Sequence, residues 1–317
     1  MRGLWLEDRR LRVRDDLPVP APPPGEARIR VTVAGVCHTD LELVRGYYPY
    51  AGVLGHEFVG VVDRSPSDPS WEGRRVVGEI NATCGACPTC LAGRSSHCER
   101  RTVLGIVNRD GAFADYVSLP IANLHAVPDT MPDDVAVFAE PVAAAFQILA
   151  QVAIDRPDRV VVFGDGKLGQ VIAQVLATTG CALTVVGRHP RKLAHLATRG
   201  IATQVDPPAA RSADIVVDCT GRREGLQAAL AALRPRGTLV LKSTFAGDTA
   251  VNLSAIVVDE ITIVGSRCGP FEPALAALAS GAVVVSPLIE TRLPLADAVD
   301  ALARAGSPGM LKVLLVP

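Results

Sequence analysis

Residues 160–169, Val160-Val161-Val162-Phe163-Gly164-Asp165-Gly166-Lys167-Leu168-Gly169, decide the fold of the chain. A β-branched apolar run leads directly into the pattern G-x-G-x-x-G, and a helix-favouring stretch follows. In this setting the first glycine allows a tight turn, the second lets a pyrophosphate approach the backbone, and the third lets the helix pack on the strand. Backbone N–H groups at the start of that helix favour the anion. The sequence therefore predicts a dinucleotide site whose contacts are Gly164, Gly166, Lys167, Leu168 and Gly169. The alternative is a glycine turn with a structural role only.

The pattern around this loop extends the prediction to a whole domain. Strand-like runs alternate with helix-like stretches at Arg159–Phe163, Lys167–Thr179, Ala182–Val186, Pro190–Arg199, Ile215–Asp218, Gly225–Leu233, Thr238–Leu241 and Ile261–Val264. Such alternation is typical of a parallel sheet with helices on both faces. The fold class predicted for this part is therefore α/β, a Rossmann doubly wound parallel sheet.

The segments on either side of this domain have a different pattern of apolar and turn residues. Residues 1–125 read as strands and loops, because alternating or apolar runs such as Ala27–Val33 and Phe58–Val62 are separated by turn residues. Residues 133–154 predict one helix that Asp133 or Asp134 could cap. A helix over Leu295–Ala305 and a strand over Leu311–Val316 are expected to close the chain.

Composition excludes several classes of partner. The 317 residues carry a formal net charge of -1, from 32 basic and 33 acidic side chains, which argues against nucleic acid or an anionic membrane. Residues 1–8 lack the apolar core of a signal peptide, and no run reaches the ~18 apolar residues of a membrane span. We therefore expect a cytoplasmic protein, in which its eight cysteines favour metal ligation over disulfides.

The end of the second predicted strand bears on the choice of cofactor. An acidic residue about 20 positions after the glycine loop usually binds the ribose hydroxyls of NAD, but no Asp or Glu occurs between Gly166 and Val205. That strand is followed instead by Gly187 and Arg188, with Arg191 and Lys192 close behind. A small residue beside a basic cluster suits a 2′-phosphate, so we expect NADP to be preferred over NAD. Arg188 is the main predicted contact, and Arg191 or Lys192 would assist it. The alternative is that these are solvated charges at a helix start.

Four cysteines at short spacing form the most specific pattern in the chain. They lie in a loop that contains Gly and Pro, in the order Cys84, Cys87, Cys90 and Cys98. Four thiolates can close a tetrahedron around Zn²⁺ and leave no open position, so the site is predicted to be structural. The remaining cysteines of the α/β part are expected to be small buried residues, namely Cys181, Cys219 and Cys268.

A second group of residues has the composition of a catalytic zinc site. Cys37 lies in a Gly-Val-Cys-His-Thr-Asp stretch, and His56 and Glu57 follow it. Glu140 adds a carboxylate to an otherwise apolar helical segment, where a charge needs a partner. One thiolate, one imidazole and one or two carboxylates leave room for water or substrate on the metal.

With these motifs the chain resembles the zinc-dependent medium-chain dehydrogenase/reductase family of alcohol, polyol and sugar dehydrogenases. The resemblance runs through Cys37-His38-Thr39-Asp40, Gly55-His56-Glu57, the four-cysteine loop, the glycine loop and Asp218-Cys219-Thr220-Gly221. It implies a GroES-like catalytic domain, residues 1–130 and 288–317, that includes the structural-zinc loop 84–98. It also implies a Rossmann domain over residues 131–287, two zinc ions per chain, and a dimer or tetramer with a contact near Ile261–Val264.

The resemblance also assigns roles at the catalytic zinc. Cys37 and His56 would bind the metal, and Glu57 would either bind it directly or exchange with water. Glu140 stands where simple alcohol dehydrogenases have cysteine, which slightly favours a polyol or sugar substrate. Thr39 matches the hydroxyl that takes the substrate proton. Glu42 replaces the histidine that often continues this relay, so either Glu42 or water would carry the proton onward, or Glu42 is a surface carboxylate.

Three other functions compete with this prediction. A metal-free quinone or enoyl reductase of the same fold would lack Cys37, His56 and the four-cysteine loop, all of which are present. A zinc-stabilised NADPH-binding sensor without turnover would not need the complete catalytic group. A carbonyl reductase of the same fold, acting on an unusual substrate, would use the same residues in the opposite direction.

Overall fold

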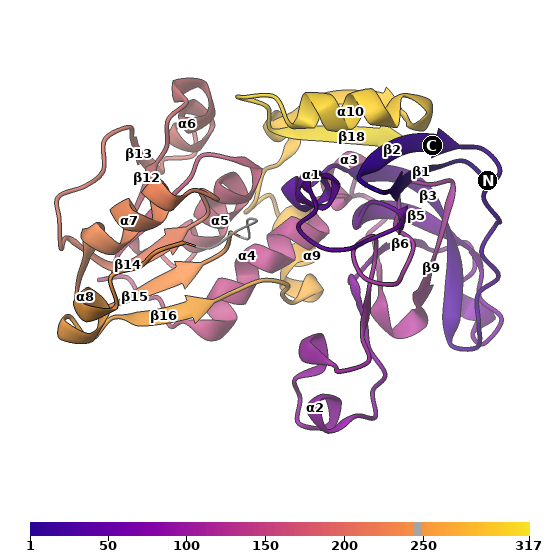
Figure 1. Cartoon of the computed structure of the whole chain (residues 1–317), viewed down its shortest axis with the longest axis horizontal. Coiled ribbons are helices and arrows are strands. Elements are labelled where there is room, and N and C mark those ends of the chain that lie inside the picture. Colours follow the sequence, from indigo (N-terminus) through magenta and orange to yellow (C-terminus); the bar gives the residue numbers. More distant parts are fainter. Residues whose placement is uncertain (244–248) are drawn as a thin grey trace. The chain divides into compact units, whose positions relative to one another are not determined.

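The computed structural model describes residues 1–243 and 249–317, which form two compact units (Figure 1). The first unit comprises residues 1–140 and 288–317, and the second comprises residues 141–287. No helix in the described ranges has both the length and the apolar character needed to cross a bilayer.

The second unit is built on a parallel sheet in the order β13-β12-β11-β14-β15-β16. The chain starts at the centre, runs outward to one edge, and then crosses to build the other half. Its strands are β11 (Arg159–Phe163), β12 (Ala182–Val186), β13 (Ala202–Gln204), β14 (Ala213–Asp218), β15 (Leu233–Leu241) and β16 (Thr262–Gly265). This order confirms the predicted doubly wound Rossmann sheet, whose ligands bind where the two halves diverge.

Helices connect these strands and cover the sheet. They are α4 (Ala139–Gln151), α5 (Lys167–Ala177), α6 (Pro190–Ala197), α7 (Arg223–Ala232), α8 (Leu253–Val258) and α9 (Phe271–Ala279). Strands β11 and β14 are buried along almost their whole length, as strands covered on both faces must be. Val161, Val216 and Leu226 belong to one of the resulting apolar clusters. The rigid sheet therefore holds the glycine loop that follows β11.

The first unit is β-rich, and strands from both ends of the chain share its main sheet, in the order β10-β6-β5-β3-β18-β17 with β9 also on β3. The strands of this sheet are β3 (Glu26–Gly35), β5 (Glu57–Arg64), β6 (Arg75–Gly78), β9 (Tyr116–Pro120), β10 (Leu124–Ala126), β17 (Ile289–Pro294) and β18 (Lys312–Val316). A smaller sheet contains β1 (Gly3–Glu7), β2 (Arg10–Arg14) and β4 (Gly52–Val53). The α-helices of the unit are α1 (His38–Arg45), α2 (Pro88–Leu91), α3 (Asp133–Ala136) and α10 (Ala298–Ala305).

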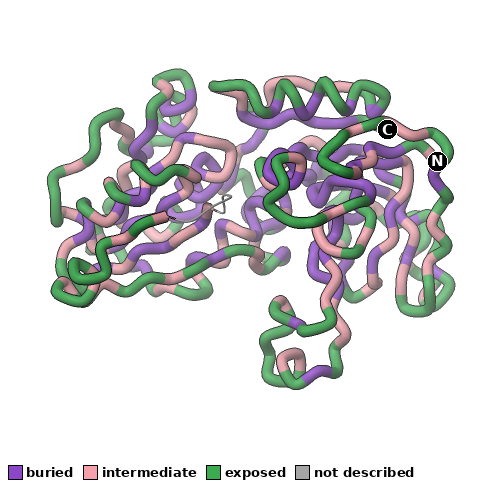
Figure 2. Tube along the Cα trace, in the orientation of Figure 1, coloured by how far each residue is buried: buried purple, intermediate pink, exposed green. Residues whose placement is uncertain are grey.

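The four cysteines lie in a lobe that projects from this unit and carries α2 (Figure 1). The short strands β7 (Asn81–Ala82) and β8 (Thr102–Val103) pair at its base. Most residues of the lobe are exposed, and Cys87 and Cys98 are buried (Figure 2). Because the lobe has almost no apolar core, its fold depends on what joins the four thiols.

Three predictions about local structure are wrong. Residues 133–154 do not form one helix but split into α3 and α4. Pro141 explains the break, because it has no N–H to donate to Val137 and is tolerated only in the first turn of a helix. Pro132 is the N-cap of α3, so Asp133 and Asp134 lie in the first turn and cap nothing.

The other two differences concern a helix and the isolated cysteines. Helix α1 lies within residues 1–125, which were expected to contain only strands and loops. Cys181, Cys219 and Cys268 are half-buried rather than fully buried. The Cys219 thiol donates to the carbonyl of Phe163 at 3.1 Å, and burial raises the pKa of that thiol.

Candidate active site

Strand pairing in the first unit brings the predicted catalytic ligands together. Gly35 at the end of β3 pairs with Glu57 at the start of β5, so the residues just beyond these positions converge. The ligand atoms of Cys37, His56 and Glu57 lie within 4.8 Å of one another. His56 and Glu57 are buried and Cys37 is half-buried. A thiol, an imidazole and a carboxylate at this spacing fit a zinc ion with an open position.

Asp40 organises this group from the first turn of α1. Its Oδ2 accepts the backbone N–H of Cys37 at 2.9 Å, which fixes the start of the helix, and its Oδ1 lies 3.2 Å from His56 Nδ1. Asp40 Oδ1 and His56 Nδ1 are both buried and lie close together, but they are not aligned as a hydrogen bond. Histidines that bind metals commonly turn their second nitrogen toward a carboxylate, which leaves the first nitrogen for the metal. Asp40 could have been noticed in the local sequence, because it stands three residues after Cys37.

The same surroundings set the charge of His56. Burial lowers the pKa of the imidazole, whereas Asp40 and Cys37 raise it, and the net pKa lies well above its usual value. A metal ion binds the neutral form of imidazole.

Glu57 has a buried cationic partner that the sequence analysis missed. The ammonium group of Lys312, in β18, contacts Glu57 Oε2, and both residues are only 1% exposed. Strand β18 pairs with β3, which carries Lys312 to the ligand group from the far end of the chain. The one available signal was a lysine at the start of the apolar run Val313–Val316.

The remaining residues that were predicted for this site, Glu140, Thr39 and Glu42, lie outside the group of three ligands. Glu140 lies half-buried in the first turn of α4 and is not a member of the group of three ligands. Thr39 Oγ1 is 3.7 Å from Cys37 Sγ. Glu42 is buried, so it is not a surface carboxylate; it accepts from Arg45 at 2.5 Å and lies 3.3 Å from His38 Nε2.

The four thiols of the lobe form a compact cluster. Four of the sulfur–sulfur distances lie between 3.5 Å, for Cys87–Cys90, and 4.0 Å, for Cys84–Cys90, and the four sulfur atoms all lie within 4.8 Å of one another. Four thiolates about 2.3 Å from one zinc ion would stand about 3.8 Å apart, so the spacing fits such an ion. The backbone N–H of Ala86 is the largest influence that lowers the pKa of Cys84, to about 6, and the Arg100 guanidinium, 3.3 Å away, also lowers it. Thiolate is the form that binds zinc.

The glycine loop of the second unit has the shape of a phosphate cradle. Gly166 is the N-cap of α5, and a Cβ placed on it would meet nothing within 4 Å. This open space lies at the start of a helix, where backbone N–H groups and the helix dipole favour an anion. Beyond β12, Arg188 and Arg191 are exposed, whereas Lys192 is buried. The loop therefore fits a dinucleotide, and Lys192 is less accessible to it than the two arginines are.

The comparisons with known proteins decide the family. The family described as the alcohol dehydrogenase GroES-like domain matches residues 23–129, and that of zinc-binding dehydrogenases matches residues 168–280. Sorbitol dehydrogenase of Halalkalibacterium halodurans is 30% identical over 95% of this chain and 94% of its own length. The chain belongs to the zinc-dependent medium-chain dehydrogenase family. It is thus a zinc-dependent, NAD(P)-linked alcohol dehydrogenase, and the predicted GroES-like and Rossmann folds are confirmed.

Solved structures of similar proteins contain either nicotinamide cofactor. A zinc-binding dehydrogenase from Sinorhizobium meliloti 1021, bound to NADP, has a TM-score of 0.90 and 28% identity over 100% of this chain and 99% of its own. An alcohol dehydrogenase from Escherichia coli CFT073, in complex with NADH, has a TM-score of 0.90 and 27% identity over 100% and 99% of the two chains.

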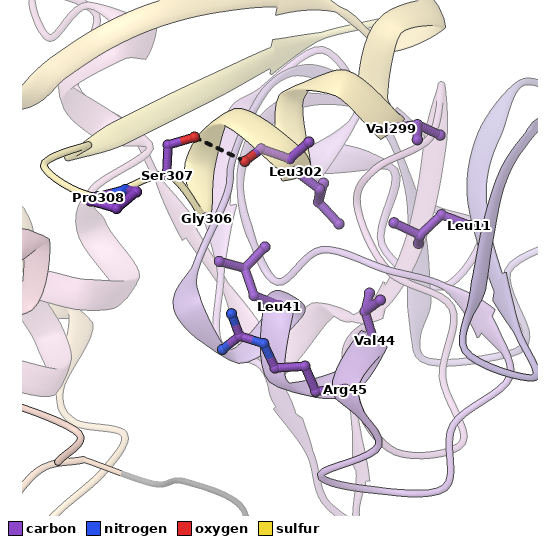
Figure 3. Close-up of a pocket in the computed structure, with 10 residues that line it drawn as sticks. Leu11, Leu41, Val44, Arg45, Val299, Leu302, Gly306, Ser307 and Pro308 are labelled. Carbon is purple, nitrogen blue, oxygen red and sulfur yellow. Dashed lines mark hydrogen bonds between the residues drawn. The ribbon is translucent and has the colours of Figure 1, made fainter.

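The dehydrogenase also has an apolar pocket of about 570 Å³ beside α1 and α10 in the first unit (Figure 3). Leu41 and Val44 of α1 line it together with Leu302 of α10. Arg45 lies at the pocket, but its guanidinium is engaged by Glu42. None of the lining residues belongs to a zinc group or to the glycine loop, so we assign no chemistry to this pocket.

Proposed function

We propose that this dehydrogenase interconverts a polyol or sugar alcohol and its carbonyl product at a zinc held by Cys37 and His56. The observation that carries the proposal is the convergence of Cys37, His56 and Glu57 within 4.8 Å, braced by Asp40 and Lys312. The polyol assignment is supported by similarity to a sorbitol dehydrogenase and by Glu140, which we propose as a further zinc ligand. The first unit would be the catalytic domain, and the second would bind the cofactor.

Each residue of the site has a proposed task. Cys37, His56, Glu57 and Glu140 would hold the zinc, which would supply acidification of a substrate hydroxyl on the scale that takes a bound water from pKa ~15.7 to ~7, and a bound nicotinamide would supply the hydride acceptor. Asp40 orients His56, and Lys312 holds Glu57 in place. Thr39 would accept the substrate proton at Oγ1 while it releases its own hydroxyl proton. We propose that the proton then leaves through water, because Glu42 is already engaged by Arg45 and His38.

Initial rates of nicotinamide reduction test this proposal. Simple alcohols, polyols and aldoses would each be supplied with NADP and with NAD, using zinc-replete and chelator-treated protein. We expect turnover of a polyol or sugar alcohol that the chelator abolishes. No turnover of any substrate, in protein shown to hold zinc and bind NADPH, would contradict the proposal and favour the sensor function or an unusual carbonyl substrate.

We propose that the dehydrogenase prefers NADP, with Arg188 as the main contact to the 2′-phosphate and Arg191 assisting. The proposal rests on the exposure of Arg188 and Arg191 just beyond β12 and on the glycine, rather than an acidic residue, at position 187. Arg188→Ala is expected to lower kcat/KM for NADP by roughly 10- to 100-fold, since charge-assisted hydrogen bonds to a phosphate are lost, with little effect on NAD. Equal efficiency with both cofactors in both proteins would rule out this preference.

We propose a second, structural zinc held by the four thiols of the lobe. Metal analysis should then find two zinc ions per chain, and Cys98→Ser should leave one. The lobe of that variant should become sensitive to proteolysis between residues 84 and 98, because little apolar packing holds it. An unchanged zinc content in Cys98→Ser would refute the assignment.

We propose that the dehydrogenase is a cytoplasmic homo-oligomer. None of the eight cysteines, all of which lie in the described residues, forms a disulfide, in keeping with a reducing compartment. Strand β16 is an edge of its sheet, Ile263 on it is 41% exposed, and Val257 and Val258 nearby are 75% and 79% exposed. A second copy could cover this edge. Light scattering should give a dimer or tetramer of the 33.3-kDa chain, and a monomer would contradict the proposal.

A further inference from the structure

Asp165, the second residue of the glycine loop, is tied to the segment that follows β12. Asp165 is only 6% exposed. Oδ2 accepts the backbone N–H of His189 at 2.6 Å, and the imidazole Nδ1 of His189 lies 3.0 Å from each carboxylate oxygen. The carboxylate is therefore fixed between the two loops that flank the cofactor site of a Rossmann sheet.

The atoms around Gly187 show where the Asp165 carboxylate lies. A Cβ built on Gly187 would lie 2.5 Å from Asp165 Cβ and 2.7 Å from its Oδ2. A side chain at position 187 would thus extend into the space that Asp165 fills. In a Rossmann sheet an acidic side chain at the end of the second strand binds the ribose hydroxyls. The Asp165 carboxylate thus lies where a side chain at position 187 would lie, and the glycine at that position leaves room for it.

We infer that Asp165 is a cofactor-specificity residue that binds the adenosine ribose and opposes a 2′-phosphate. The inference rests on the proposed cofactor pocket at Gly187 and Arg188. A carboxylate has about four acceptor positions, so hydrogen bonds from His189 leave capacity for a ribose hydroxyl. Its negative charge repels a 2′-phosphate, whereas Arg188 attracts one. Asp165 therefore favours NADH and Arg188 favours NADPH, and their two opposite effects together determine the ratio of the affinities for the two cofactors.

Binding measurements without substrate test Asp165 directly. NADPH and NADH would be titrated, by their own fluorescence, against the full-length zinc-replete protein and its Asp165→Asn variant. Asparagine keeps the shape of the side chain and can accept the His189 N–H, but it carries no charge. The ratio of Kd for NADPH to Kd for NADH is expected to fall roughly 10- to 100-fold, which is the scale of removing one nearby like charge. An unchanged ratio, with both cofactors bound as before or both weakened equally, would overturn the inference and leave Asp165 as a brace for His189.

Arg188→Ala, titrated in parallel, separates this inference from the proposed NADP preference. It should move the ratio in the opposite direction. If only Asp165→Asn moves the ratio, the Arg188 pocket fails and the Asp165 assignment stands; if only Arg188→Ala moves it, the reverse holds. Should Asp165→Asn not fold, His189→Ala serves instead: removal of the imidazole leaves the Asp165 charge less compensated, so the ratio must move toward NADH. A ratio unchanged in that variant would also overturn the inference.

Discussion

Replacing His56 with alanine is expected to lower kcat/KM by about 10³-fold or more and to remove one zinc ion per chain. His56 is a buried member of the three-ligand group, and without it Cys37 is left with carboxylates alone, of which Glu57 is already paired with Lys312. A catalytic metal supplies several kcal/mol of transition-state stabilisation, and about 4 kcal/mol corresponds to a factor of about 10³. Steady-state kinetics on the best alcohol, together with metal analysis, would measure both effects.

Two further variants calibrate this result. Asp40→Asn keeps every proposed ligand but removes the charge beside His56 Nδ1, so a loss of roughly 10- to 100-fold is expected. His125 is a matched control, because it lies in the same unit and is also paired with an acid, Glu79, at 3.0 Å. His125→Ala should keep its zinc and its activity. If His56→Ala retained both zinc ions, the assignment of His56 as a ligand would be wrong.

The order of the Rossmann elements was predictable because each one is marked locally. The predicted strand Arg159–Phe163 has the same bounds as β11, in which all residues after the exposed Arg159 are buried, and the predicted strand Ala182–Val186 has the same bounds as the less buried β12. A parallel strand covered on both faces must be apolar throughout, so its ends are visible as changes in composition. The helix boundary at Pro141 was less visible, since Ala, Val and Leu on both sides favour a helix and only the missing N–H interrupts it.

The ligand types of the site were predictable, but their supporting contacts were not. Cys37, His56 and Glu57 stand in short motifs, and the pairing of β3 with β5 brings them together. Lys312 reaches Glu57 across a separation of 255 residues, through the pairing of β18 with β3. A contact between residues so far apart in the chain leaves no pattern in the local sequence. Asp165 was hidden in the same way, because its partner His189 is on another loop.

Replacing Lys312 with methionine is expected to destabilise the first unit by about 3–5 kcal/mol, which is the usual cost of leaving one member of a buried ion pair without its partner. Both residues of the pair are 1% exposed, so water cannot take over the role of the ammonium group. Methionine fills a similar volume, and the loss is therefore one of charge rather than of packing. Chemical denaturation of chelated protein would measure the change apart from any effect of zinc.

The double variant Lys312→Met/Glu57→Gln tests whether the unpaired charge is the cause. Removing the second charge should restore part of the loss, giving a coupling free energy of about 1–3 kcal/mol between the two positions. Arg304→Met is the matched control, because it breaks an ion pair with Asp300 in which both side chains are 54% exposed, and it should cost no more than about 0.5 kcal/mol. Equal, small losses in Lys312→Met and Arg304→Met would show that Glu57 does not depend on its buried lysine. A large loss that the double variant partly reverses would mean that the last strand of the chain holds a proposed zinc ligand in place.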